Sequence, residues 1–157
     1  MAEIITDEAV PFTFSGGQKV NLIPISLMLL EQFDKSHIPP DPPKRKITVA
    51  GDVEEEIYDP DDEGYQRVLE IHNAKATHDF MELICNFGME LELPDDDKWM
   101  RQLTAAGIEF DKDLPESAYV QYKCMRMFQD DLKRMTEVIL RISGVGEEAI
   151  QSWVEMF

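Results

Sequence analysis

The chain has 157 residues, 43% of them hydrophobic and 30% charged, and its 32 acidic residues outnumber its 15 Lys and Arg to give a formal charge of −17. This composition is typical of a folded protein of one domain, residues 1–157, whereas the charge disfavours binding to nucleic-acid phosphates or to an anionic membrane surface. The first ten residues lack the basic start and apolar run of a secretory signal, and two widely separated cysteines predict neither a disulfide framework nor a zinc site.

Residues 1–60 predict a β-hairpin, a short helix and a link rich in proline and acidic residues. Residues 10–14 (VPFTF) and 19–23 (KVNLI) are β-branched and aromatic runs on either side of a Ser-Gly-Gly-Gln turn, a pattern typical of a hairpin. Ser26 is expected to begin the helix, because its side chain can accept a hydrogen bond from an unpaired backbone N–H.

A second hairpin is expected after the proline-rich link. Residues 37–43 (HIPPDPP) contain four prolines, which remove backbone donors and favour an extended chain. Residues 46–50 and 53–58 then flank Gly51-Asp52, although the VEEEIY sequence at 53–58 also suits the start of a short helix. The basic run at 44–46 is interpreted as the exposed start of a strand; the alternative is a contact with an acidic partner.

Residues 61–157 predict the helical part of the chain. Apolar residues three and four apart predict a helix of about seven turns from Asp61 to near Gly88. Its expected stripe consists of Tyr65, Leu69, His72, Ala76, Phe80, Leu83 and Phe87. Shorter helices are expected at 94–107, at 114–142 with a restart at Asp130-Asp131, and from Glu147 to the C-terminus. The fold class is therefore predicted as α+β, mainly α: a small N-terminal β-hairpin element followed by a bundle of about five or six helices.

Residues 59–70 nearly match a twelve-residue calcium-binding loop. Acidic residues occupy its first, third and fifth positions, Gly64 the sixth and Glu70 the twelfth. Three features weaken the match: Glu63 at the fifth position crowds the loop, Gln66 replaces an apolar residue at the eighth, and no good helix precedes the loop. We favour the alternative that Asp-Pro and Asp61 cap the long helix, which leaves weak Ca²⁺ binding at Asp59–Glu70 as the other possibility.

Other motifs that carry chemistry are missing from the sequence. His72 and His78 are six residues apart, a spacing that puts them on separate faces of a helix, whereas a metal pair needs three or four. No phosphate-binding loop or nucleophile elbow is present. We therefore expect a protein that is not an enzyme, with no catalytic residues, no cofactor and no metal.

The last helix is the best candidate for binding another protein. Large apolar residues line one side of it, and the candidate partner-binding residues are Ile150, Trp153, Val154 and Phe157. The alternative is that the helix packs against the core of its own chain, as an ordered terminal helix usually does. Insertion into a groove of another chain uses the same spacing of apolar residues.

Five segments, taken in order, carry a resemblance to a known family. They are the N-terminal strand pair (VPFTFSGGQKVNLIPIS), the proline link (HIPPDPP), an Asp-Pro-Asp-Asp-x-x-Tyr-Gln entry to the long helix, Leu93-Pro94-Asp95 with Trp99, and residues 139–145 followed by Glu147-Glu148. Together they cover most of the chain, and their order resembles that of the tail assembly chaperones of long-tailed (siphovirus-like) bacteriophages.

The resemblance implies a non-enzymatic protein of the host cytoplasm that is absent from the mature virion. Such a chaperone binds the phage tape-measure protein and keeps it soluble while the tail-tube protein, a second potential partner, assembles around it. The family has no catalytic residues to transfer, and the sequence leaves open a homo-oligomer and a longer frameshifted form. Two alternatives are a structural virion or tail-completion protein and an acidic decoy of a nucleic-acid-binding protein, the latter because residues 52–63 hold eight acids and no base.

Overall fold

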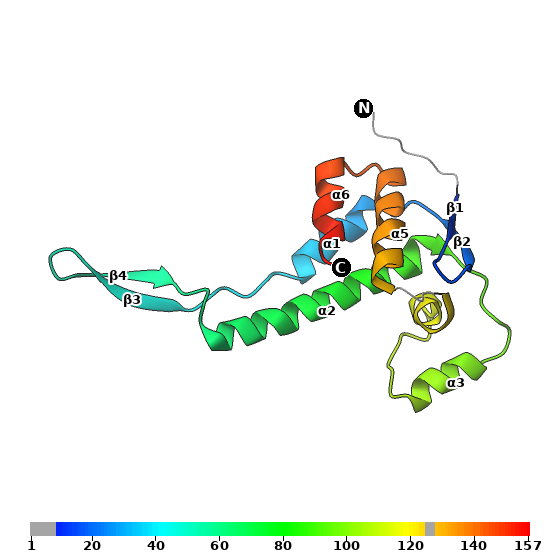
Figure 1. The fold of residues 1–157 in the computed structure, drawn as a ribbon, viewed down its shortest axis with the longest axis horizontal. Coiled ribbons are helices and arrows are strands. Elements are labelled where there is room, and N and C mark those ends of the chain that lie inside the picture. Colours follow the sequence, from blue (N-terminus) through cyan, green and yellow to red (C-terminus); the bar gives the residue numbers. More distant parts are fainter. Residues whose placement is uncertain (1–8, 125–127) are drawn as a thin grey trace.

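The computed structural model describes residues 9–124 and 128–157, and these form the α+β, mainly helical fold that the sequence predicts. A small N-terminal hairpin comes first, and the chain then continues mostly as helices (Figure 1). The elements are β1 (Val10–Thr13), β2 (Lys19–Leu22), α1 (Leu27–Ser36), β3 (Lys44–Val49), β4 (Val53–Tyr58), α2 (Glu63–Phe87), β5 (Met89–Glu90), α3 (Lys98–Ala105), α4 (Glu116–Tyr119), the π-helical turn η1 (Val120–Cys124), α5 (Phe128–Ile142) and α6 (Glu147–Val154). Within the described residues, no helix combines the length and the apolar character needed to cross a membrane.

The first hairpin is confirmed, and it belongs to a three-stranded sheet. β1 and β2 pair antiparallel from Val10 opposite Leu22 to Thr13 opposite Lys19. Strand β5 was not predicted; its two residues follow α2 after Gly88 and pair with the other edge of β2. Since β5 continues from α2, the sheet is tied to the end of the longest helix.

The second hairpin is also confirmed, so residues 53–58 (VEEEIY) form a strand and not the start of a short helix. β3 and β4 pair antiparallel over their whole length, and the backbone N–H of Asp59 donates to the carbonyl of Pro43 at the base, at 2.7 Å. Figure 1 shows this hairpin and the first half of α2 projecting away from the other elements. We call residues 38–75 the arm, because Ala76 is the first residue of α2 to be buried.

The main core surrounds the second half of α2. Its buried side chains on that helix are Ala76, Phe80, Met81, Ile84 and Cys85. The predicted stripe is therefore wrong at its end, where Leu83 is only half-buried and Phe87 is 41% exposed. The reason is that several elements, α4 and α5 among them, pack on this part of α2. Which side chains of α2 are buried is therefore decided by these neighbours and not by a single stripe.

Several predicted helix boundaries moved. The side chain that caps α2 belongs to Asp62, which accepts from the N–H of Tyr65 at 2.9 Å, and not to Asp61. The predicted helix from 114 divides into α4, η1 and α5. Residues 125–127, which fall within that predicted helix, lie outside the described residues. The helix from Glu147 begins as predicted, after Gly144 turns the chain with φ of 88°.

Candidate functional site

The four residues predicted to bind a partner lie against the core of their own chain. Ile150 is fully buried and Val154 is 7% exposed, while Trp153 and Phe157 are half-buried beside them. The ring centroids of Trp153 and Phe157 lie 4.8 and 5.4 Å from that of Phe80 on α2, both in stacked arrangements. The hydroxyl of Thr77 also donates to the carbonyl of Met156 at 3.1 Å. The helix thus packs on its own core, as the alternative interpretation expected.

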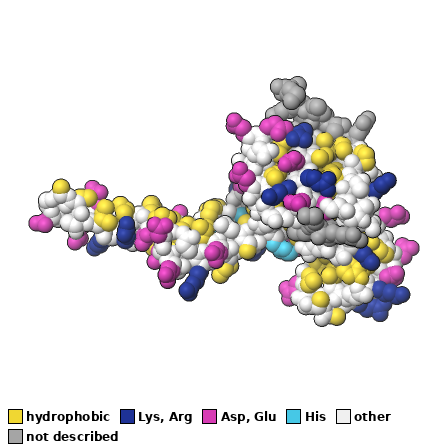
Figure 2. All heavy atoms as spheres, in the orientation of Figure 1, with side chains coloured by type: hydrophobic (Ala, Val, Ile, Leu, Met, Phe, Trp, Pro, Cys, Tyr) yellow, Lys and Arg dark blue, Asp and Glu magenta, His cyan; other side chains and the backbone are white. Residues whose placement is uncertain are grey.

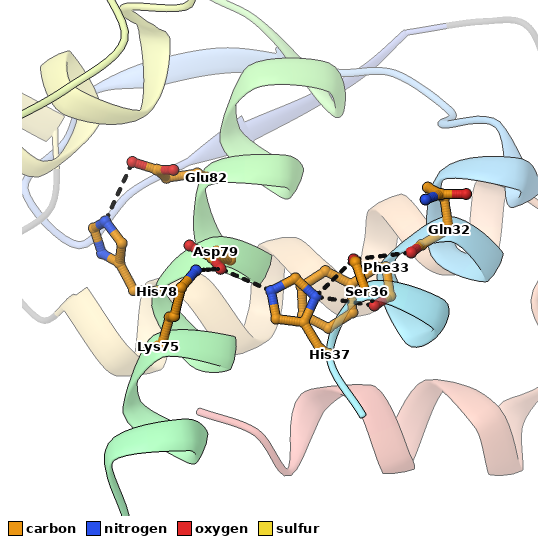
Figure 3. Close-up of polar contacts among 8 residues, drawn as sticks. All are labelled: Gln32, Phe33, Ser36, His37, Lys75, His78, Asp79 and Glu82. Carbon is orange, nitrogen blue, oxygen red and sulfur yellow. Dashed lines mark hydrogen bonds and ion pairs between the residues drawn. The ribbon is translucent and has the colours of Figure 1, made fainter. Parts of the chain in front are cut away.

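A histidine in the proline link joins this aromatic cluster to α2 (Figure 3). The His37 ring stacks on Phe33 of α1 with centroids 3.9 Å apart and planes 14° apart. Its Nε2 lies 2.7 Å from Oδ2 of Asp79, and the ammonium of Lys75 reaches the same oxygen at 2.5 Å. This contact holds the start of the proline link against the second half of α2.

The carboxylate of Asp79 titrates below its ordinary range. Partial burial works to raise its pKa, but hydrogen bonds from His37 and Lys75 and the charge of Lys75 outweigh burial, so the pKa is lowered. The site therefore holds a carboxylate that stays ionised. Through His37 it connects the proline link to α2, and through Lys75 it is paired within that helix.

A second carboxylate anchors the N-terminal hairpin to α5. Asp131 is fully buried, and its Oδ1 accepts from the backbone N–H of Ser15 at 3.0 Å and from the Ser15 hydroxyl at 2.6 Å. Arg134 donates to the same oxygen at 2.7 Å, and its guanidinium also lies over the ring of Phe12. The sequence placed Asp131 at a helix start, where acids are common, but could not show that it reaches Ser15 at the tip of the first hairpin.

The Asp131 anchor predicts a specific dependence of stability on pH. Burial works to raise the pKa of Asp131, but the hydrogen bonds from Ser15 and Arg134 lower it below that of an ordinary Asp, about 3.9. Its contribution to stability is therefore present above that ordinary value and is lost as pH falls through the lower folded pKa. Asp131→Asn should lower the free energy of unfolding by about 2 kcal/mol at pH 7, with a smaller difference below about pH 4.

The measurement is urea unfolding of both proteins, followed by circular dichroism, at neutral and acidic pH. The matched control is Asp130→Asn, because Asp130 is the exposed neighbour in the same helical turn and should show little effect at either pH. A wild-type minus Asp131→Asn difference that stays constant as the pH falls would refute the anchor.

The two cysteines lie in the core, where neither is a reactive thiol. Cys85 and Cys124 are both free and buried. Burial is the largest cause that raises the pKa of each thiol, so both stay protonated and poorly nucleophilic at neutral pH. Their role is to fill space between α2 and η1.

The calcium-like segment does not form a loop. α2 begins at Glu63, so the residues at the fifth to twelfth loop positions, including Gly64 and Glu70, lie on a regular helix. A calcium loop of this type turns sharply at its glycine and gathers ligands from most of its length. Among the described residues, no group of three or more His, Cys, Asp or Glu side chains is placed to hold a metal ion.

The arm carries exposed apolar side chains beside acidic ones. Val68 and Ile71 of α2 are 52% and 71% exposed, and three-residue spacing places them near each other on the helix. Val68 also lines a shallow hollow of about 280 Å³ where α2 meets the proline link. The hollow is lined by Pro40, Asp41, Pro43, Asp62, Gly64, Tyr65 and Val68. Figure 2 shows apolar side chains interleaved with acidic ones along the arm.

We name Pro40, Pro43, Tyr65, Val68 and Ile71 the arm surface. The sequence did not single it out, because Val68 and Ile71 fall outside the stripe chosen for the long helix. The only sequence signal for this surface was the presence of apolar residues outside the main stripe of the long helix.

Comparison with protein-family models, with curated proteins and with solved structures found no match for this chain.

Proposed function

We propose that this protein is a non-enzymatic chaperone of bacteriophage tail assembly that binds the tape-measure protein in the host cytoplasm. It keeps the helical, apolar segments of that client soluble while the tail tube assembles, and it is absent from the mature virion. The observation that carries the proposal is the arm surface: apolar side chains exposed on a projecting, acidic element.

The shape and chemistry of the arm surface suit a helical client. Exposed apolar side chains one helical turn apart, beside a shallow hollow, can pack against the apolar side of an amphipathic helix. Asp41 and Asp62 border the hollow, so basic residues flanking the apolar side of the client would find carboxylates there. The strong negative charge of the whole chain keeps such a complex dissolved.

The core of the protein need not open for this binding. The side chains of α6 are held in the aromatic cluster, whereas Val68 and Ile71 of the arm surface are already exposed in the free protein. A client that binds the arm therefore avoids the cost of unpacking Trp153 and Phe157.

The direct experiment is co-expression with the tape-measure protein of the same genome, followed by affinity purification. We expect a soluble complex, and the double variant Val68→Glu with Ile71→Glu should lose at least about tenfold in the amount of client recovered, because it places charges where apolar contact is needed. Solubility of the client should fall in parallel.

The matched control is Met28→Glu, which introduces the same charge at a side chain of α1 that is 76% exposed and lies outside the arm. It should bind the client as the wild type does. Failure of the wild-type protein to co-purify with the client or to increase its solubility would refute the proposal. Detection of the protein in purified mature particles by mass spectrometry would favour a structural virion protein instead.

A further inference from the structure

The hairpin of β3 and β4 has two faces of different chemistry. Residues directly opposite each other in an antiparallel pair project to the same side, so the register assigns each side chain to a face. One face holds the pairs Lys44–Tyr58, Lys46–Glu56 and Thr48–Glu54. The other holds Arg45–Ile57, Ile47–Glu55 and Val49–Val53, and we call it the apolar face of the hairpin.

The apolar face has no layer packed on it among the described residues. Each strand packs mainly against the other strand, and Figure 1 shows the hairpin at the far end of the arm from the core. Val53 is 53% exposed. Isolated two-stranded hairpins are marginally stable in water and gain stability from packing of their apolar side. A second layer would therefore both cover apolar area and stabilise the hairpin.

The charges on the hairpin are sorted by strand. β3 begins with Lys44, Arg45 and Lys46, whereas β4 carries Glu54, Glu55 and Glu56. On the apolar face this leaves one Arg on one strand and one Glu on the other, and within the described residues neither forms an ion pair. A partner that places an acid near Arg45 and a base near Glu55 would complement both charges, and a second copy of this face carries one of each.

We propose that the apolar face of the hairpin binds the same face of a second copy of this chain, forming a two-fold symmetric dimer. With the symmetry axis parallel to the strands, β3 of each copy lies over β4 of the other. Val49 then faces Val53 of the other copy and Arg45 faces Ile57, and the long side chain of Arg45 reaches diagonally to Glu55, two residues along the same strand. A two-fold axis repeats each contact, so the basic strand meets the acidic strand twice.

The position of the hairpin at the end of the arm favours a dimer in which only the two hairpins touch over one in which the two whole molecules pack together. Two chains of formal charge −17 repel each other, but contact at the ends of two arms keeps the remaining charge of each chain apart, and the hairpin itself is nearly balanced in charge. The apolar face is smaller than a standard interface, so the dimer should be weak and reversible.

Charge exchange between two variants provides the test. Sedimentation velocity of the full chain over a range of concentrations should show a monomer–dimer equilibrium. Arg45→Glu and Glu55→Arg should each weaken self-association by about tenfold, because each places like charges together at both symmetric contacts. An equimolar mixture of the two variants should form a heterodimer again, since every contact then joins Arg to Glu.

A cysteine pair gives a second, independent measurement. An equimolar mixture of Val49→Cys and Val53→Cys, the two positions that face each other in the dimer, should give a covalent heterodimer under mild oxidation, whereas a mixture of Thr48→Cys and Glu54→Cys on the opposite face should not. A wild-type protein that stays monomeric at all concentrations would overturn the proposal, as would a variant mixture that associates no better than either variant alone. The proposed binding of a client to the arm surface is read out separately, so failure of one does not imply failure of the other.

Discussion

Replacing Phe80 with alanine is expected to lower the free energy of unfolding by about 3–5 kcal/mol, the range typical of a buried aromatic residue. The Phe80 ring is fully buried and lies between elements that are distant in sequence. Its centroid is 4.8 Å from that of Trp153, 5.4 Å from that of Phe157 and 5.4 Å from that of Phe33. The substitution removes the ring contacts of Phe80 with Phe33 on α1 and with Trp153 and Phe157 at the C-terminus. The packing of α6 on α2 should therefore weaken.

The measurement is urea unfolding followed by tryptophan fluorescence, to which Trp153 beside the cavity and Trp99 in the second hydrophobic cluster both contribute. Phe87→Ala is a matched control, because it changes the same residue type on the same helix at a side chain that is 41% exposed. It should cost about 1 kcal/mol or less. Equal losses for the two substitutions would mean that the predicted stripe was correct and that the observed burial of α2 is not.

Replacing Gly88 with alanine is expected to cost about 2–3 kcal/mol, because the new methyl group has no space. A Cβ at this position would lie 2.7 Å from Cδ1 of Ile139 and 2.7 Å from the carbonyl oxygen of Ile84. The side chain of Ile139 on α5 can shift, but the backbone oxygen at the end of α2 cannot move as easily. The carbonyl oxygen of Gly88 itself accepts a hydrogen bond at 2.9 Å from the N–H of Ile23. A displaced backbone at Gly88 would therefore also disturb the link that follows β2.

Thermal and urea unfolding measure this loss, and two further variants locate its cause. Gly64→Ala changes a glycine in the first turn of the same helix, where the nearest atom is a carboxylate oxygen of Asp62 at 3.3 Å that can rotate away. Its effect should be small. Adding Ile139→Val to Gly88→Ala should recover part of the lost stability, and a double-mutant cycle without coupling would show that the clash with Ile139 is not the cause.

Local signals in the sequence were sufficient for the identity of most elements. The glycine-containing turns between β-branched runs predicted the first hairpin and were compatible with the second, for which a short helix at 53–58 was the alternative. The prolines of residues 37–43 excluded helix, and Ser26 caps α1 as expected, accepting from the N–H of Met28. These features depend on neighbours within a few residues, so no knowledge of the rest of the chain was needed. Strand β5 could not be found in this way, because two residues carry no period and pair only through the edge that β2 offers.

The candidate sites depend on contacts between distant segments, and for that reason the sequence identified few of them. His37 and Asp79 are 42 residues apart, and Ser15 and Asp131 are 116 apart, yet each pair is in hydrogen-bond contact. Nothing in their local sequence distinguishes Asp131 from the exposed Asp130 next to it. Only the path of the chain brings these groups together.

The sequence by itself determined the fold class, the order of most elements and the strong acidity of this protein, because these follow from composition and short-range periodicity. Only the tertiary structure decided which apolar residues are buried and which remain available. Ile150, Trp153, Val154 and Phe157 have the spacing of a binding helix, but they pack on α2, whereas Val68 and Ile71 stay exposed because α2 extends beyond the core. The same apolar side chain is core or surface according to what packs against it, and that is a property of the whole fold.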